Sequence, residues 1–150
     1  MPPQPMPGTE STVQGAVVDL LLADAALNAL VPQGSIYGGE AVPEAQLPFV
    51  VVHGADPVKR WVTLANRFEV TQLRVEVYAT GATAAGQPNP AEAIAANVER
   101  VVNWQDLPIP NTTPIRVEQR SHTLSEERKR SSTKARVYKV EMRWEVELAY

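Results

Sequence analysis

The 150-residue chain contains no cysteine and only two histidines. The lack of cysteine excludes disulfide bonds, thiolate metal ligands and cysteine nucleophiles, and it leaves the redox compartment undetermined. Neither His53 nor His122 belongs to an HxxxH or HExxH spacing, which would bring two metal ligands onto one helical face. We therefore expect no metal site, and we interpret the two histidines as a strand-end residue and a hairpin-edge residue.

The common motifs of catalysis and nucleotide binding are also missing. The sequence has no GxSxG elbow, no GxxxxGK(S/T) phosphate loop and no GxGxxG after a strand. An enzyme would need a clustered polar pocket, and no residues are committed to one. We therefore expect neither a cofactor nor enzymatic activity.

Long apolar runs and excess positive charge are absent as well. Asp19 and Asp24 interrupt the only apolar stretch that approaches the ~18 residues of a membrane span. The formal net charge of −3 argues against a protein that coats nucleic acid. We expect a soluble protein that contacts no membrane, with a flexible proline-rich arm over residues 1–10 and a single domain over 11–150.

Hydrophobic spacing predicts the elements of the first half. A helix is expected to begin at Ser11 or Thr12 and to break near Asp24, which can cap a second short helical turn. The apolar run 49–52 predicts a buried strand. A second strand over 68–79 changes the phase of its apolar positions, which predicts a bulge or bend near 71–72.

The second half carries clearer signals. Asn89, Pro90 and Glu92 form a strong helix start, and the helix is expected to run to about Asn103. The segments 115–124 and 134–149 predict a long antiparallel pair, in which the start of the last strand projects as an arm. In that last strand apolar residues alternate strictly with Glu141, Arg143, Glu145 and Glu147, as a half-buried strand requires.

Two segments are candidate contact sites. The run 125–134 is either a solvated hairpin tip or a charged finger that inserts into a neighbouring ring or touches phosphate, and its acidic residues favour a protein partner over DNA. Its candidate residues are Glu126, Glu127, Arg128, Lys129 and Arg130. The second candidate is an exposed loop over 56–66 with Lys59, Arg60 and Trp61. The rings of Trp61 and Trp104 suit interface anchors and core lids equally well.

The order of parts between residues 17 and 52 resembles one family. A helical segment "LLLADAALNALV" over 20–31 is followed by Ile36-Tyr37 and by "LPFVVV" over 47–52. This order, continued by the long central strand, the capped helix and the closing strand pair, resembles the tail terminator, or tail completion, proteins of long-tailed double-stranded DNA bacteriophages.

The resemblance implies an α+β fold with a mainly antiparallel mixed sheet, two flanking helices and a protruding β-hairpin. It implies a hexameric ring at the head–tail junction of a virion, assembled in the host cytoplasm. Such a ring caps the tail tube, stops its polymerisation and joins the tail to the neck, while DNA passes through the lumen without specific binding. Residues Glu141, Glu145 and Glu147 would then line the lumen or pair across subunits with residues such as Arg143.

Two other functions remain open at this point. A head-completion or neck protein of the same virion would share the ring symmetry and the size but dock on the portal side. A small nucleic-acid-binding module would show salt-sensitive DNA affinity, and the negative net charge counts against it.

Overall fold

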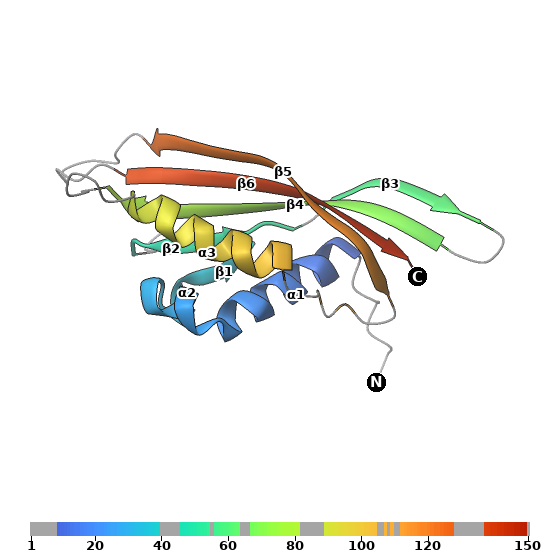
Figure 1. Cartoon of the computed structure of the whole chain (residues 1–150), viewed down its shortest axis with the longest axis horizontal. Helices are drawn as coiled ribbons and strands as arrows, with labels where there is room; N and C mark the ends of the chain where they lie inside the picture. The colour runs from blue at the N-terminus through green and yellow to red at the C-terminus, as the bar shows by residue number, and fades with distance from the viewer. Residues whose placement is uncertain are drawn as a thin grey trace.

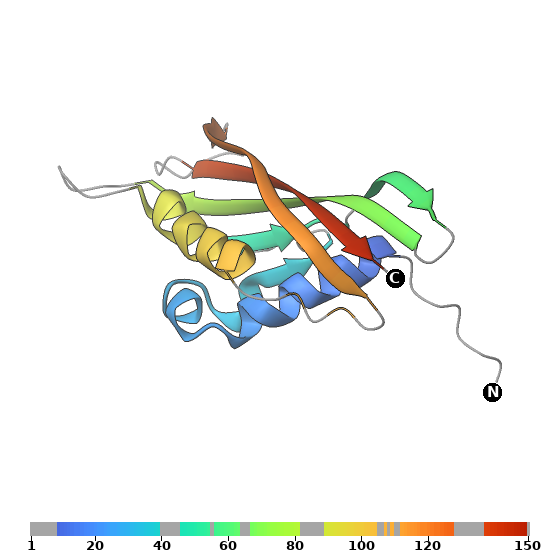
Figure 2. The ribbon, with the colours of Figure 1, turned by 45° about the vertical axis from the view of Figure 1, so that its right-hand side comes forward.

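A computed structural model describes residues 9–39, 46–54, 56–63, 67–81, 89–104, 107, 109, 112–127 and 137–149, excluding the side chains of 9–12, 56–59 and 127. In these residues a sheet of six strands carries a layer of helices on one face (Figures 1 and 2). The helices are α1 (Thr9–Ala23), α2 (Ala25–Leu30), α3 (Pro90–Trp104) and the 3-10 turn η1 (Gln33–Ser35). The other face of the sheet bears no helix in the described part of the chain, and we call it the open face.

The strands are joined in the order β1-β2-β4-β6-β5, and β3 pairs with β4 beside β2. Only β1 and β2 are parallel, while the other ladders are antiparallel. The expected α+β fold with a mainly antiparallel mixed sheet is thus confirmed. The strands span β1 (Ile36–Gly38), β2 (Phe49–Val52), β3 (Asp56–Val62), β4 (Arg67–Thr80), β5 (Thr113–Glu127) and β6 (Val137–Ala149).

The predicted break in the first helical segment lies at Asp24. This residue has an extended backbone, and its Oδ2 accepts a hydrogen bond from the Leu27 amide at 2.9 Å. The expected start at Ser11 or Thr12 is wrong, since α1 begins at Thr9. Thr9, Ser11 and Thr12 all carry a hydroxyl that suits a helix start, so residue type alone does not select among them.

The helix α3 is the element that the sequence predicts best. The Asn89 side chain accepts a hydrogen bond from the Ala91 amide at 2.9 Å, and the helix ends at Trp104, one residue past the expected end. Its predicted apolar face packs into the core between helices and sheet. The buried residues of this face are Ala91, Ile94, Ala95, Val98, Val101 and Val102.

Strand β6 is an interior strand of the sheet, between β4 and β5. Its predicted alternation is confirmed, because the side chains directed at the helices are completely buried. These are Val140, Met142, Trp144, Val146 and Leu148. Trp144 is the largest of them, and its indole N–H donates to Asn103 Oδ1 of α3 at 2.7 Å, which ties the sheet to the helical layer.

β4 pairs with β6 in one unbroken register from Phe68 to Thr80, so the predicted bulge does not lie in β4 itself. The register shift lies opposite, between Pro57 and Lys59 of β3, which pair with Thr71 and Val70. The apparent change of phase has another cause: Glu69 and Thr71 are buried on the helix-covered side of β4, at positions where the sequence pattern leads one to expect apolar residues.

The expected loop over 56–66 is also corrected, since residues 56–62 form strand β3. Together with the first part of β4, this strand makes a hairpin that extends past the helices at one end of the sheet (Figures 1 and 2). At the opposite end, the start of β6 pairs with the last residues of β5. None of the helices in the described ranges has the length and apolar character of a membrane span.

Candidate partner-binding surfaces

The β3–β4 hairpin presents two stacked aromatic rings on the open face. The rings of Trp61 and Phe68 lie opposite each other in the ladder, with centroids 5.2 Å apart and planes inclined by 12°. The next residue, Val62, is 75% exposed. The expected contact residues Lys59, Arg60 and Trp61 thus lie on a projecting hairpin strand, although the Lys59 side chain lies outside the described residues.

The hairpin is held together by a buried carboxylate. Glu69 is completely buried, and its Oε2 lies 3.3 Å from Arg60 Nε and 3.9 Å from Arg67 Nη2. Removing a buried carboxylate from water is costly unless cations compensate it. Arg60 therefore has a structural role in this chain as well as the contact role expected for it.

The second contact segment lies at the opposite end of the sheet. Glu126 and Glu127 belong to the last part of β5 and pair with Tyr138 and Val137 of β6. Arg128, Lys129 and Arg130, together with the rest of the expected hairpin tip, lie outside the described residues, as does the start of the expected arm over 134–136. Glu126 and Glu127 therefore lie at the opposite end of the sheet from the β3–β4 hairpin.

The glutamates of β6 are compensated within the chain. Glu145 Oε2 accepts a hydrogen bond from Arg120 at 2.8 Å, and Arg116 Nη2 lies 3.7 Å from the same oxygen. Arg116 Nε is also 3.5 Å from Glu147 Oε2. The hydrogen bond to Glu145 raises the pKa of Arg120, against a smaller opposing effect of burial.

The same holds for the fourth charged residue of this strand, Glu141. Its Oε1 accepts from Nε and Nη2 of Arg143 at 2.8 and 2.7 Å. The open face is therefore a network of ion pairs instead of an uncompensated acidic stripe. Such a face has little net attraction for DNA or repulsion from it.

A second network surrounds His53 at the end of β2. Arg74 Nη2 lies 3.2 Å from His53 Nδ1, and because a guanidinium only donates, His53 Nδ1 is the acceptor. His53 Nε2 then carries the proton toward Glu76 Oε1, 2.6 Å away. Burial by itself raises the pKa of Glu76, but the hydrogen bond from Tyr78 and the electrostatic interactions with His53, Lys139 and Arg74 together lower it.

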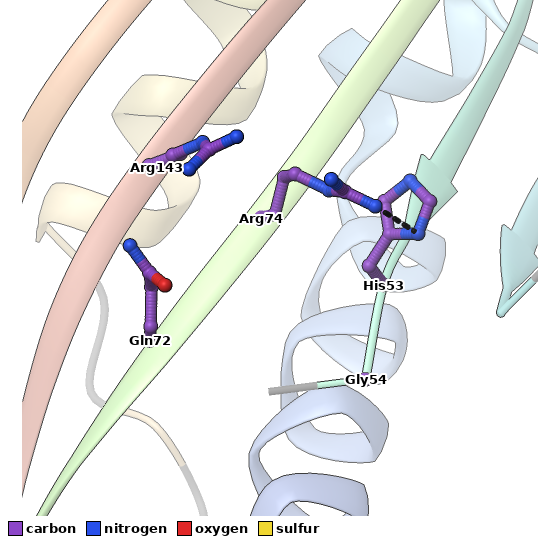
Figure 3. A pocket seen from close by; sticks show the side chains of 5 residues that line it. All are labelled: His53, Gly54, Gln72, Arg74 and Arg143. Carbon is purple, nitrogen blue, oxygen red and sulfur yellow. Dashed lines mark hydrogen bonds between the residues drawn. The ribbon is translucent and has the colours of Figure 1, made fainter. Parts of the chain in front are cut away.

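The His53 network borders a polar pocket of about 130 Å³ on the open face. Figure 3 shows the lining residues His53, Gly54, Gln72, Arg74 and Arg143, with both guanidinium groups beside the pocket. Arg74 and Arg143 are directly opposite each other in the β4–β6 ladder. No group of three His, Cys, Asp or Glu in the described residues is arranged to hold a metal ion. The lining is rich in hydrogen-bond donors, so the pocket suits an anion.

Sequence reasoning missed this pocket. It treated His53 as an ordinary strand-end residue and used only the apolar positions of β4. The available signal was the polar series Gln72, Arg74 and Glu76, which a period of two places on one face of a strand. The pairing of β4 with β6, which brings Arg143 to Arg74, is a tertiary feature that no local pattern encodes.

Trp104 and His122, two further residues considered in the sequence analysis, differ in their surroundings. Trp104 is 84% exposed at the end of α3, beside Ile115, which is 50% exposed. His122 belongs to β5, and its ring contacts two glutamates of α3. Its Nε2 lies 2.7 Å from Glu92 Oε2 and its Nδ1 lies 2.5 Å from Glu99 Oε1. Trp104 thus has the exposure of an interface anchor, whereas His122 clamps the helix to the sheet.

Comparisons with known proteins agree with this architecture. The family model described as "Tail completion protein gp17" matches residues 15–146. A solved structure described as "Virion of native gene transfer agent (GTA) particle" contains a chain with a TM-score of 0.69 and 23% sequence identity, and the match covers 92% of this chain and 95% of that chain. No curated protein matches the sequence.

Proposed function

Since the chain belongs to the tail completion protein gp17 family, we propose that it is the tail terminator of a phage virion. The family match over residues 15–146 is the observation that carries this proposal, because it spans β1 to β5, most of β6, all of α2 and α3, and the larger part of α1. A tail completion protein is a structural component of the virion. In the proposed role it caps the tail tube, stops its polymerisation and joins the tail to the head–neck connector.

A ring of identical subunits, expected to be a hexamer, is part of the proposal. Strand β5 supports it: this strand is 15 residues long, and in the described part of the chain only its β6 side is paired. A long open strand edge is a ready site for pairing with another chain. A second copy that pairs there would extend the sheet from subunit to subunit, and a rotation that closes would give a ring.

The two hairpin ends supply the proposed docking surfaces for other virion proteins. The β3–β4 hairpin carries the stacked pair Trp61 and Phe68 together with Arg60 and Lys59, and aromatic and arginine side chains are the usual anchors of interfaces. Glu126 and Glu127, the first two residues of the charged segment 126–130, lie at the other end of the sheet. One end would then face the tail tube and the other the neck, which is the geometry that a joining ring needs.

The paired charges of the open face suit a surface past which DNA travels. If this face lines the lumen, Glu141, Glu145 and Glu147 act there as members of ion pairs with Arg143, Arg116 and Arg120. Balanced charges neither hold the phosphate backbone nor repel it strongly at physiological ionic strength. The proposed lumen is therefore a surface without specific affinity for DNA.

The first experiment is light scattering of the purified protein, alone and with tail-tube protein. A ring-sized species, or one that forms only when tubes are present, is the expected result. A monomer that ignores tubes but binds portal or neck proteins would assign the chain to head completion instead. A protein that binds neither would contradict the terminator proposal.

A further inference from the structure

We propose that the pocket between His53, Gln72, Arg74 and Arg143 is a binding site for a carboxylate side chain of a protein partner in the virion. This inference rests on the proposed function for the identity of the partner as a virion protein. Its chemistry rests on the lining residues alone.

Two like charges lie opposite each other at the pocket. Arg74 and Arg143 are direct cross-strand partners, and directly opposed like charges in a sheet are destabilising. The neighbouring cross-strand pair, Glu76 and Glu141, is likewise of one sign. Opposite charges therefore meet along each strand, with Arg74 at 3.6 Å from Glu76 and Arg143 at 2.7 Å from Glu141. The two arginines are left side by side at the pocket (Figure 3).

Arg74, Arg143 and Gln72 also have N–H groups that are available for hydrogen bonds. Arg143 uses Nε and Nη2 for Glu141, and Arg74 uses Nε and Nη2 toward Glu76 and His53, so neither Nη1 has a partner in the described part of the chain. Each guanidinium carries five N–H groups in a fixed fork. The side-chain amide of Gln72 is exposed and likewise makes no hydrogen bond to the described residues.

The pocket is open to solvent and large enough for a carboxylate group. Both arginine side chains are 41% exposed, so a group from outside can reach them. A carboxylate can accept about four hydrogen bonds and matches a guanidinium in two-point contact. The pocket of about 130 Å³ accepts a group of this size without displacement of the sheet.

The surroundings favour a carboxylate over the phosphates of DNA. Glu76 and Glu141 stand beside the two arginines, and Glu145 follows on β6 opposite Gln72. Duplex DNA carries one charge per ~1.7 Å of its axis, so a phosphate in the pocket would bring further phosphates against these carboxylates. A single acidic side chain on a protein brings no such row of charges.

The test is a titration of the isotope-labelled protein with a blocked tripeptide that carries one glutamate, acetyl-Ala-Glu-Ala-amide, followed by the NMR signals of the Gln72 amide and the arginine Nε–H groups. We expect these signals to shift, and Arg143→Gln to weaken the binding about tenfold, in line with the loss of a charge-assisted hydrogen bond. The matched control is Arg116→Gln, which removes the same charge from the same face. Arg116 is already engaged by Glu118, Glu145 and Glu147, so its replacement should change the affinity less than twofold.

Three outcomes would overturn the inference. Equal weakening by Arg143→Gln and Arg116→Gln would mean that only the overall charge matters. Tighter binding of a short DNA duplex at the same signals, with a strong salt dependence, would make the pocket a phosphate site. If the NMR signals of Gln72 and of both arginines do not shift, the pocket does not bind a carboxylate. The titration needs neither a ring nor a tube, so its result is independent of the light-scattering test of tail-terminator function.

Discussion

One carboxylate oxygen of Asp24 serves two helices. Its Oδ2 accepts the Leu27 amide of α2 at 2.9 Å and the Arg100 guanidinium of α3 at 2.6 Å, although Asp24 and Arg100 are 76 residues apart in the chain. The hydrogen bond to Arg100, opposed by burial and aided by the Leu27 amide, lowers the pKa of Asp24. Asp24 thus caps α2 and also links this helix to α3.

Replacement of Asp24 by alanine is expected to lower the free energy of unfolding by about 1–2 kcal/mol. Most of this loss comes from the helix cap, because Arg100 is 44% exposed and an exposed ion pair contributes little. Urea denaturation followed by circular dichroism measures the effect. The matched control is Asp19→Ala in α1, where the carboxylate is exposed, and an equal loss in both variants would contradict the capping role.

The Asn103 side chain supports the buried indole of Trp144. Asn103→Ala would leave that N–H without its acceptor, and an unsatisfied buried donor costs about 1–3 kcal/mol. Asn103→Asp keeps an acceptor oxygen but loses the bond that the amide donates to Gln119, so it should retain most of the stability. Thermal unfolding of the two variants separates the effects, and an equally unstable Asp variant would show that the indole bond is not the cause.

His122 should make stability depend on pH. Burial lowers its pKa, but the hydrogen bonds and charges of Glu92 and Glu99 outweigh burial and raise it above the ordinary 6.5. A raised pKa in the folded state stabilises the protein fully below pH ~6.5 and loses this contribution as the pH rises through the folded value. The free energy of unfolding can be measured by urea denaturation for the wild type and for His122→Gln from about pH 5 to about pH 9. The difference between the two proteins should shrink as the pH rises.

The two carboxylates with shifted pKa values do not contribute to the pH dependence between about pH 5 and about pH 9, as these shifts imply. Asp24 and Glu76 have lowered pKa values, so their contributions are lost only as the pH falls below their ordinary values of 3.8 and 4.5. A difference between the wild type and His122→Gln that stays constant from neutral to alkaline pH would contradict the clamp between β5 and α3.

The projecting hairpin supplies a docking prediction. Trp61→Ala is expected to weaken binding to tail-tube protein at least tenfold, because truncated interface aromatics commonly cost ~2 kcal/mol or more. Trp104→Ala at the end of α3 is the matched control and should leave the binding to tubes unchanged. Surface plasmon resonance on immobilised tubes measures both, and the reverse ranking would place the tube contact at the end of α3.

The charged segment at the other end supplies a second docking prediction. Deletion of residues 128–132, which leaves the paired Glu126 and Glu127 in place, is expected to abolish docking to a virion partner while the monomer stays folded. Circular dichroism and co-sedimentation with tail-tube and neck proteins measure the two properties. Loss of folding would show that the segment is structural.

Local patterns predicted the elements whose burial has a simple period. The strict alternation of β6 and the capped apolar stripe of α3 are each dictated by one buried face. Strand β3 was missed because its sequence lacks such a period, and the irregularity beside Pro57 interrupts the alternation. The cap at Asp24 was predicted for the same local reason, whereas its bond to Arg100 depends on how the helices pack.

The contact surfaces were only partly predictable. Charge and aromatic content pointed to Lys59, Arg60, Trp61 and the segment 126–130, and these remain predictions. Composition could not reveal that Arg116 and Arg120 neutralise Glu145 and Glu147, because that depends on the register of β5 against β6. The anion pocket likewise requires the register of β4 against β6, which brings Arg74 to Arg143.

The interior position of β6, between β4 and β5, has a consequence during synthesis. This strand is the last one described along the chain, yet it supplies the ladders that join β4 to β5 and buries five of its side chains in the core. While the ribosome still holds β6, the helices and the earlier strands have no completed sheet to cover. Folding of this domain must therefore finish after β6 has been translated, so the core stays incomplete while the earlier strands emerge.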